Sequence, residues 1–327
     1  MNPKKILLIR TDRIGELILT APAINSVRAA FPEAEISLIV SASSFEAVEG
    51  MRSVDKVLVI DPASEFSSLR KVLEFVLGLR KKNFDMAVIF NPSKLMNLAV
   101  FLAGIPVRAG YDRKLGFLLN RRIADRKFLC EKHEVEYNLD LIKASGIEPL
   151  GKDLSFDVFP ADEETAGVIA RTAGLCSRKK FIVVHAATSN PEKVWPADRF
   201  ATLCNMVEAG LGVKVVLAGG KDEERVSQEV KDKAGNPFCD LTGKLDLKEF
   251  AALLRMAILL VSCDSGPVHV SVAVGTPVVA LFGESRPGGS SRRWGPYGTG
   301  HTVVGKPAVI DISVEEVFEA VKARILQ

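Results

Sequence analysis

The segment Ser262-Cys263-Asp264-Ser265-Gly266-Pro267-Val268-His269 follows an uninterrupted apolar run, Ala257–Val261, in the 327-residue sequence. Continuous apolar residues predict a strand that is buried on both faces of a parallel sheet. Gly266 frees the backbone after that strand, and Pro267 suits the first turn of a helix, whose early N–H groups lack partners. The segment therefore predicts a buried strand, a tight turn and a helix in direct succession.

The turn at residues 264–266 has two interpretations. A turn of small residues that leads into a helix presents exposed amide donors and a partial positive charge, which suit a phosphate or diphosphate. An ordinary connection, in which Asp264 or Ser265 is the N-cap of the helix, accounts for the same residues. This segment alone leaves both open, and the remaining motifs favour the first.

Short apolar runs alternate with helical patterns along the rest of the chain, which predicts βαβ units, parallel sheets and an α/β protein. The expected strands cover residues 5–10, 35–40, 56–60, 85–90, 108–110, 180–185, 212–218, 259–262 and 277–282. The expected helices cover residues 15–30, 69–79, 200–208, 223–233, 247–256 and 267–274, with a last one after Ser313. Pro22 has to lie early in its helix.

The chain is longer than a single core normally supports, so two domains are expected. We expect an N-terminal domain over 1–155, a linker region over 156–178 and a C-terminal domain over 179–327. Around the linker we expect a short strand at 154–158 and a capped helix from Asp162. The sequence allows the last helix to pack back on the N-terminal domain. Two such domains normally place a ligand in the cleft between them, at the carboxyl ends of the strands.

The composition is that of a globular protein, with 47% hydrophobic and 25% charged residues. No apolar run reaches the roughly 18–20 residues that a membrane span needs. Ile6–Ile9 is too short for the apolar core of a secretion signal and is expected to be a strand. Five cysteines without a CxxC pair indicate reduced thiols in a cytoplasmic protein. They are Cys130, Cys176, Cys204, Cys239 and Cys263.

The net charge is only +3, but the basic residues are unevenly placed. Residues 70–132 contain fourteen Lys or Arg against five Asp or Glu, whereas residues 151–327 contain 21 against 22. This asymmetry suggests that the first half meets an anionic ligand or surface, although solvated helix faces explain it too. Nucleic acid is disfavoured because the chain has three Tyr, two Trp and no recognisable nucleic-acid module.

Two segments at the ends of predicted strands carry acidic residues. In the first, Arg10-Thr11-Asp12-Arg13-Ile14-Gly15-Glu16, the carboxylate of Glu16 lies at a helix start and is placed to accept a proton from an incoming hydroxyl, or simply stabilises the helix. In the second, Gly219-Gly220-Lys221-Asp222-Glu223-Glu224, an acidic side chain either accepts hydrogen bonds from a ribose or caps the helix. The first segment lacks the G-x-G-x-x-G fingerprint, which disfavours a dehydrogenase.

The long polar loop His185–Pro196 is a further candidate. Lys193 in it can neutralise phosphate charge as a mobile cation, and loops of this kind concentrate binding groups. Trp195 is expected to be a core anchor. His269, one turn into the helix that follows Asp264, either contacts a diphosphate or packs in the core. A long stretch rich in Gly and Pro, residues 282–298, is also expected to be functional.

Taken together, these residues resemble glycosyltransferase family 9, the ADP-heptose:lipopolysaccharide heptosyltransferases. The matching motifs are K-I-L-L-I-R-T-D-R-I-G-E-L-I-L-T-A-P (5–22), K-V-W-P (193–196), D-S-G-P-V-H (264–269), L-F-G (281–283) and G-P-Y-G (295–298). The resemblance implies a GT-B-type α/β fold, in which two Rossmann-like domains with parallel sheets face each other across a cleft. It also implies that neither a metal ion nor a cofactor is needed, the ADP-sugar being the donor substrate.

The resemblance assigns roles to individual residues. It implies that Glu16 is the base, although the family commonly has Asp there, and that Lys193 acts on the diphosphate. The implied nucleotide-sugar contacts are Thr188, Lys193, Glu223, Asp264, Ser265, Gly266 and His269. The implied contacts with an anionic lipopolysaccharide acceptor are Arg13, Arg113, Lys114, Arg121 and Arg122. For such an acceptor, the resemblance implies a cytoplasmic enzyme that contacts the inner membrane peripherally.

These motifs predict the inverting transfer of a heptose to a hydroxyl of the lipopolysaccharide inner core. Two other classes stay open at this point. A nucleotide-sugar epimerase of similar two-domain shape would act on UDP-GlcNAc without an acceptor. A non-catalytic nucleotide-binding protein, which the Glu at position 16 allows for, would bind ADP and transfer nothing.

Overall fold

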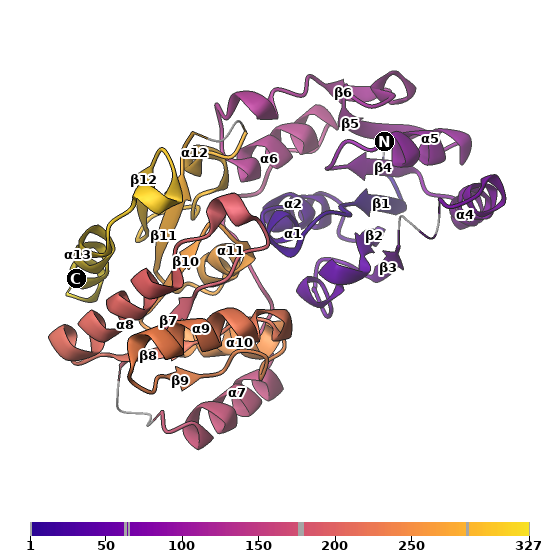
Figure 1. Cartoon of the computed structure of the whole chain (residues 1–327). Helices are drawn as coiled ribbons and strands as arrows, with labels where there is room; N and C mark the ends of the chain where they lie inside the picture. Colours follow the sequence, from indigo (N-terminus) through magenta and orange to yellow (C-terminus); the bar gives the residue numbers. More distant parts are fainter. Residues whose placement is uncertain (1, 62–63, 65, 176–179, 286–287, 327) are drawn as a thin grey trace. The chain divides into compact units, whose positions relative to one another are not determined.

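The computed structural model describes residues 2–61, 64, 66–175, 180–285 and 288–326, and Figure 1 follows the chain through them. The chain divides into two compact units, Met1–Ser155 and Phe156–Gln327. Among the described residues, each unit contains one six-stranded sheet whose strands all run parallel. The end of the expected linker, with Cys176, and the residues Arg286 and Pro287 lie outside the described residues.

The first unit alternates strands and helices as the apolar runs predict. Its strands are β1 (Lys5–Ile9), β2 (Glu35–Ser41), β3 (Lys56–Ile60), β4 (Met86–Ile89), β5 (Val107–Tyr111) and β6 (Arg121–Ile123). Its helices are α1 (Ile14–Ile18), α2 (Ala21–Ala30), α4 (Leu69–Lys82), α5 (Lys94–Leu102) and α6 (Glu134–Ala144), with short 3-10 helices η1 (Ala42–Ala47), η2 (Gly116–Leu118) and η3 (Lys127–Leu129).

The second unit repeats this scheme. Its strands are β7 (Phe181–His185), β8 (Lys214–Leu217), β9 (Cys239–Asp240), β10 (Leu259–Cys263), β11 (Val278–Gly283) and β12 (Thr302–Lys306). Its helices are α7 (Pro160–Thr172), α8 (Ala197–Leu211), α9 (Glu224–Ala234), α10 (Leu247–Met256), α11 (Gly266–Ala273), α12 (Ser291–Trp294) and α13 (Val314–Ile325), with 3-10 helices η4 (Pro191–Lys193), η5 (Lys221–Glu223) and η6 (Val309–Asp311).

Both sheets have the same topology. The strand order is β3-β2-β1-β4-β5-β6 in the first and β12-β11-β10-β7-β8-β9 in the second, which is one order when each unit's strands are counted separately. It is the order of a Rossmann fold, and it reverses between β1 and β4 and between β7 and β10. Parallel α/β sheets bind ligands at such reversals, outside the carboxyl ends of the strands.

Helices cover both faces of each sheet, which explains why the strands are apolar throughout. In the first unit α4 and α5 pack on the face that carries Leu7 and Ile9, while α2 and α6 pack against each other. In the second unit α8, α9 and α13 share one apolar cluster with the strands, while α7 packs against α10. Val317 and Val321 of α13 belong to that cluster, so the buried face of the last helix lies in the second unit's own core.

Several expected boundaries are corrected. The single helix expected over 15–30 is two helices, α1 and α2, because Pro22 has no N–H to continue the first and instead lies in the first turn of the second. Residues 154–158 are not a strand. The helix expected from Asp162 begins at Pro160, and the Asp162 carboxylate accepts a hydrogen bond from the Phe159 N–H at 2.8 Å.

The four described cysteines are free thiols: Cys130, Cys204, Cys239 and Cys263. Burial raises the pKa of Cys263 to about 12 and also raises that of Cys204, so neither is a ready thiolate. Among the helices described, none is both long and apolar enough to span a bilayer.

Candidate functional site

The topological switch point of the second unit brings the predicted motifs of that unit together. His185 ends β7 and is the register partner of Ser262 on the neighbouring β10. Helix α11 starts at Gly266, three residues after β10 ends, as the opening segment predicts. The loops after β7, β8 and β10 all leave the same edge of the sheet, because the strands are parallel.

Lys193 and Asp264 form an ion pair at this edge. The Lys193 Nζ lies 2.5 Å from the Asp264 Oδ2, and both side chains are largely buried, with 16% and 9% of their surface exposed. The 3-10 helix η4 holds Lys193, since the Asn190 side chain caps its start by accepting from the Glu192 N–H. The structure therefore places the expected diphosphate cation directly beside the turn that starts α11.

Ser265 is the N-cap residue of α11, but its hydroxyl does not cap the helix. Of the two caps that the ordinary interpretation of this turn offers, the one from the Ser265 side chain is therefore wrong. The Ser265 Oγ lies 2.9 Å from the Ser262 Oγ instead, so this hydroxyl does not occupy the early amides of α11. His269, one turn further on, is 4% exposed and packs in the interior.

Glu223 points back into this site from η5. Its Oε2 accepts a hydrogen bond from the Gly220 N–H at 2.7 Å and lies 3.1 Å from the His185 Nε2. A Cβ on Gly219 would collide with that oxygen, so the glycine leaves room for the carboxylate. Burial would raise the pKa of Glu223, but the bonds from His185 and Gly220 outweigh it and lower the pKa below its ordinary value.

The remaining residues of the long polar loop have separate roles. The Thr188 Oγ1 accepts from the Asn190 N–H at 3.4 Å and is partly exposed beside β7. Trp195 is 1% exposed, donates from Nε1 to the Ile312 carbonyl at 2.9 Å and packs edge-on against Phe200. Trp195 is thus the core anchor that the sequence predicts.

The first unit carries the segment Arg10–Glu16 at its own switch point, directly after β1. Arg10 is 2% exposed. Its guanidinium donates to the Glu134 Oε1 from both Nη1 and Nη2 at 3.3 Å and to the Phe90 carbonyl at 3.4 Å. Asn138 accepts from the same Nη1 at 3.4 Å, so α6 fixes the position of this arginine.

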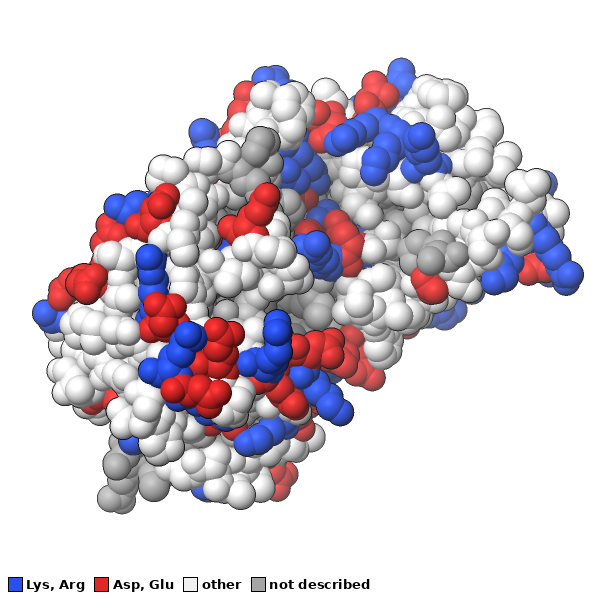
Figure 2. Space-filling model, in the orientation of Figure 1, with Lys and Arg blue, Asp and Glu red and all other residues white. Residues whose placement is uncertain are grey.

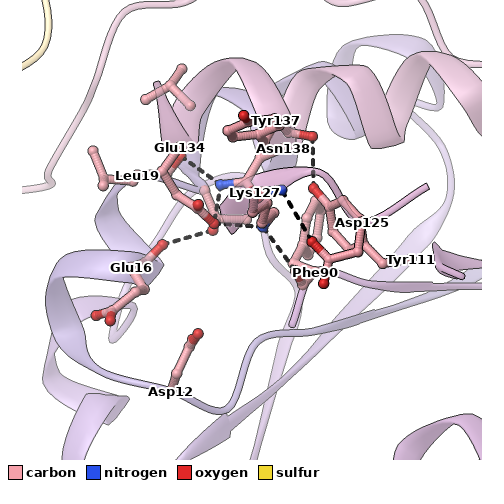
Figure 3. Close-up of polar contacts among 12 residues, drawn as sticks. Asp12, Glu16, Leu19, Phe90, Tyr111, Asp125, Lys127, Glu134, Tyr137 and Asn138 are labelled. Atoms are coloured by element: carbon pink, nitrogen blue, oxygen red, sulfur yellow. Dashed lines mark hydrogen bonds and ion pairs between the residues drawn. The ribbon is translucent and has the colours of Figure 1, made fainter. Parts of the chain in front are cut away.

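A second cation shares the buried carboxylate. The Lys127 Nζ lies 2.6 Å from the Glu134 Oε1 and 4.3 Å from the centre of the Tyr111 ring (Figure 3). The Tyr111 hydroxyl donates to the Tyr137 carbonyl at 2.8 Å, which ties β5 to α6. The Glu134 carboxylate therefore faces two buried cations just beneath the Arg10–Glu16 turn.

Asp12 and Glu16 are the acidic groups of that turn. The Asp12 Oδ1 lies 2.7 Å from the Arg10 Nε, whereas the carboxyl group of Glu16 points away from the buried cluster in Figure 3. Burial raises the pKa of Glu16 and the charge of Asp12 raises it further, against the opposing charges of Arg10 and Arg13. A carboxylate with a raised pKa is a stronger base once it is ionised.

The residues expected to bind an anionic acceptor are exposed. Arg113 and Arg122 pair with carboxylates, at 3.1 Å with Asp125 and 3.5 Å with Asp112 respectively. The exposed residues among those expected are Arg13, Arg113, Lys114, Arg121 and Arg122. Figure 2 shows Lys and Arg side chains gathered over the part of the first unit where β5 and β6 lie in Figure 1. The structure thus provides a basic surface beside the end of this sheet.

The family model of glycosyltransferase family 9 (heptosyltransferase) matches residues 72–319, which is more than half of the chain. The chain belongs to this family. Lipopolysaccharide heptosyltransferase 2 of Escherichia coli is 25% identical over 350 residues, with 99% of both chains covered. The resemblance seen in the motifs is therefore confirmed.

Solved structures of this family share the fold. A family 9 glycosyltransferase from Veillonella parvula is similar with a TM-score of 0.87 at 24% identity, covering 99% of this chain and 97% of its own. The ADP-heptose lipopolysaccharide heptosyltransferase II of E. coli has a TM-score of 0.80 at 22% identity, with 99% of both chains covered. The expected GT-B-type α/β fold is confirmed. A UDP-GlcNAc 2-epimerase from Neisseria meningitidis is more distant, with a TM-score of 0.54 at 13% identity, covering 98% of this chain and 91% of its own.

Several site residues carry little signal in the sequence. His185 is the last residue of β7 and Ser262 the last but one of β10, so both lie within longer apolar motifs. Glu134, Asn138 and Lys127 lie more than a hundred residues from Arg10, so no local pattern joins them. The one signal for Glu134 is a carboxylate in the first turn of a helix, which is more often a helix-start residue than a buried partner.

Replacing Glu134 by Gln is expected to lower the free energy of unfolding by about 3–5 kcal/mol, because the buried Arg10 and Lys127 would lose the carboxylate that they share. Urea denaturation of the two proteins measures this. Glu131→Gln is the matched control: its ion pair with Arg126 is about half exposed, so a change of no more than about 1 kcal/mol is expected. Equal effects of the two substitutions would show that the buried cluster contributes no more than a surface pair.

Proposed function

We propose that this chain is an inverting, metal-independent glycosyltransferase that moves a heptose from ADP-heptose to a hydroxyl of the lipopolysaccharide inner core. The family match and the E. coli heptosyltransferases similar to the chain support it. The observation that carries it is the Lys193–Asp264 pair beside the start of α11, which the Ser265 hydroxyl does not cap, so that a cation and helix donors meet at a switch point.

The second unit would hold the donor. The diphosphate would lie at the start of α11 near Ser265 and Gly266, with Thr188 and His269 close by. Lys193 would face its outer oxygens, and Glu223 would accept hydrogen bonds from the ribose. As the bond from the anomeric carbon to the diphosphate oxygen breaks, negative charge grows on ADP, and these fixed donors stabilise it.

The first unit would hold the acceptor. The carboxylate of Glu16 takes the proton of an acceptor hydroxyl while that oxygen attacks the anomeric carbon from the side opposite to ADP, which inverts the configuration. The exposed basic residues near β5 and β6 suit the anionic groups of the acceptor and a peripheral position at the cytoplasmic face of the inner membrane. Transfer requires that the two units bring both substrates together, and the facing arrangement across a cleft stays a prediction.

A panel of nucleotides tests the donor half of this proposal. We expect ADP to raise the thermal unfolding midpoint of the protein more than UDP, GDP or CMP at equal concentration, because at a fixed concentration the ligand with the higher affinity for the native state stabilises it more. A clear preference for UDP, or no stabilisation by any of the four, would overturn the ADP-sugar assignment.

Two other functions give different outcomes. One alternative is an epimerase, because the N. meningitidis epimerase has a similar fold. An epimerase would convert UDP-GlcNAc to its isomer with no acceptor present. A non-catalytic protein would bind ADP and transfer nothing. Incubation with UDP-GlcNAc alone, followed by chromatography of the sugar product, separates the first from a transferase.

A further inference from the structure

Four side chains in the second unit form a continuous chain of polar contacts that ends at helix α11. His185 lies in the middle and is 2% exposed. Its Nε2 lies 3.1 Å from the Glu223 Oε2, and its Nδ1 lies 3.0 Å from the Ser262 Oγ. The Ser262 Oγ in turn lies 2.9 Å from the Ser265 Oγ. The chain therefore joins the β8 loop to the start of α11 through the switch point.

The direction of the hydrogens along this chain follows from Glu223. Its lowered pKa means that it is ionised near neutral pH, and a carboxylate can only accept. The His185 Nε2 therefore carries a hydrogen toward Glu223. In the singly protonated ring, the Nδ1 is then an acceptor with one lone pair. Two hydroxyls compete for that lone pair, since the Ser265 Oγ also lies 3.4 Å from it.

Ser262 is the better placed of the two donors. It is fully buried, at 0% exposure, and is closer to the Nδ1. The Cys263 carbonyl oxygen, 3.0 Å from the Ser262 Oγ, competes for the same hydrogen, but an imidazole nitrogen is the more basic acceptor. When Ser262 donates to the His185 Nδ1, that nitrogen is satisfied, and the Ser265 hydroxyl can donate to another acceptor.

The difference between the two serines matters because Ser262 is buried, whereas Ser265 is partly exposed at the start of α11. A hydroxyl that donates to a phosphate oxygen makes a charge-assisted bond, which is stronger than a neutral one. If Ser262 were absent, the Ser265 hydroxyl would be the remaining donor for the buried Nδ1, and leaving that nitrogen unpaired has a cost. Ser262 thus controls where the Ser265 hydrogen points without touching the ligand.

We propose that Ser262 and His185 are positioning residues that release the Ser265 hydroxyl to the diphosphate and tie it, through Glu223, to the nucleoside end of the site. The proposal rests on the proposed function, since it assigns the start of α11 to a diphosphate. It predicts that a side chain with no access to ligand nevertheless sets the affinity for the phosphates.

Calorimetric titration of Ser262→Ala with ADP and with adenosine tests this. We expect the ADP affinity to fall about tenfold, the loss of roughly one charge-assisted hydrogen bond, with adenosine affinity unchanged. The double variant with Ser265→Ala should bind ADP no more weakly than Ser265→Ala alone, because both substitutions remove the same bond. A purely structural role of Ser262 would weaken both ligands alike.

Ser271→Ala is the matched control. Ser271 is also fully buried and its hydroxyl donates to the Thr276 carbonyl at 3.1 Å, within the same part of the fold but outside the chain of contacts. It should leave ADP affinity unchanged. Should Ser262→Ala not fold, Ser262→Cys takes its place, since a thiol of similar size is a weak donor and a partial loss for ADP is expected.

Two results overturn the proposal. One is a Ser262 variant that binds ADP as the unsubstituted protein does, and the other is a double variant whose losses are the sum of the single ones. Failure of the proposed function gives a different result, because in that case the unsubstituted protein itself would not bind ADP.

Discussion

Glu16→Gln is expected to lower the turnover number for heptose transfer by about 10²-fold or more, the usual contribution of a positioned general base. The amide keeps the size of the side chain but cannot accept the hydroxyl proton. ADP affinity should stay close to that of the unsubstituted protein, because Glu16 belongs to the first unit and the proposed nucleotide contacts to the second. Turnover measured by ADP release, with calorimetry of ADP, separates the two effects.

The pH profile gives this prediction a second readout. Glu16 must be ionised to act, so activity should be lost as the pH falls through its pKa, which burial and Asp12 raise. Asp12→Asn removes a neighbouring negative charge, lowers that pKa and should move the acid limb to lower pH. An unchanged turnover in Glu16→Gln, or an acid limb that stays in place in Asp12→Asn, would remove Glu16 from the role of base.

Lys193→Ala is expected to lower kcat/KM by about 10²-fold, the scale of losing one preorganised charge at a developing anion. The substitution removes the cation that faces the diphosphate, and it also leaves the Asp264 carboxylate without that partner, where it repels the phosphates. ADP affinity should fall together with the rate. Steady-state kinetics and calorimetric titration of ADP measure both.

Lys221→Ala is the matched control for this substitution. Lys221 lies in η5 of the same unit, but its side chain is exposed. It should change neither ADP affinity nor rate beyond the small effect of one surface charge. If Lys193→Ala titrates with ADP like the unsubstituted protein, Lys193 does not bind the diphosphate.

Most of the fold could be predicted from the sequence, because buried parallel strands are apolar along their whole length. The predicted strands of the first unit match β1 to β5, and those of the second match β7, β8, β10 and β11. The missed strands carry no such signal: β6 has three residues, two of them exposed arginines, and β9 has two residues. In β12 the apolar run has only two residues, Val303 and Val304, before Gly305, and Val303 is exposed.

The site residues that lie within short sequence motifs could be predicted. Lys193 and the turn at Asp264 come from two motifs, and the parallel topology brings them to one sheet edge. The partners of Arg10 on α6, Glu134 and Asn138, were not predictable, because only the folded sheet brings them beneath the turn. The same holds for Lys127 on η3, which shares Glu134. His185 is a similar case, since its two ring nitrogens bond to residues 38 and 77 positions away.

Mass spectrometry of the acceptor tests the central claim most directly. A lipopolysaccharide inner-core acceptor is incubated with ADP-heptose and the purified protein, and its mass is compared with that of a reaction containing Glu16→Gln. The account predicts that the acceptor gains one heptosyl residue, with one ADP released for each, and that the gain is nearly absent with the variant. ADP release without any gain in acceptor mass, or an equal gain with the variant, would contradict it.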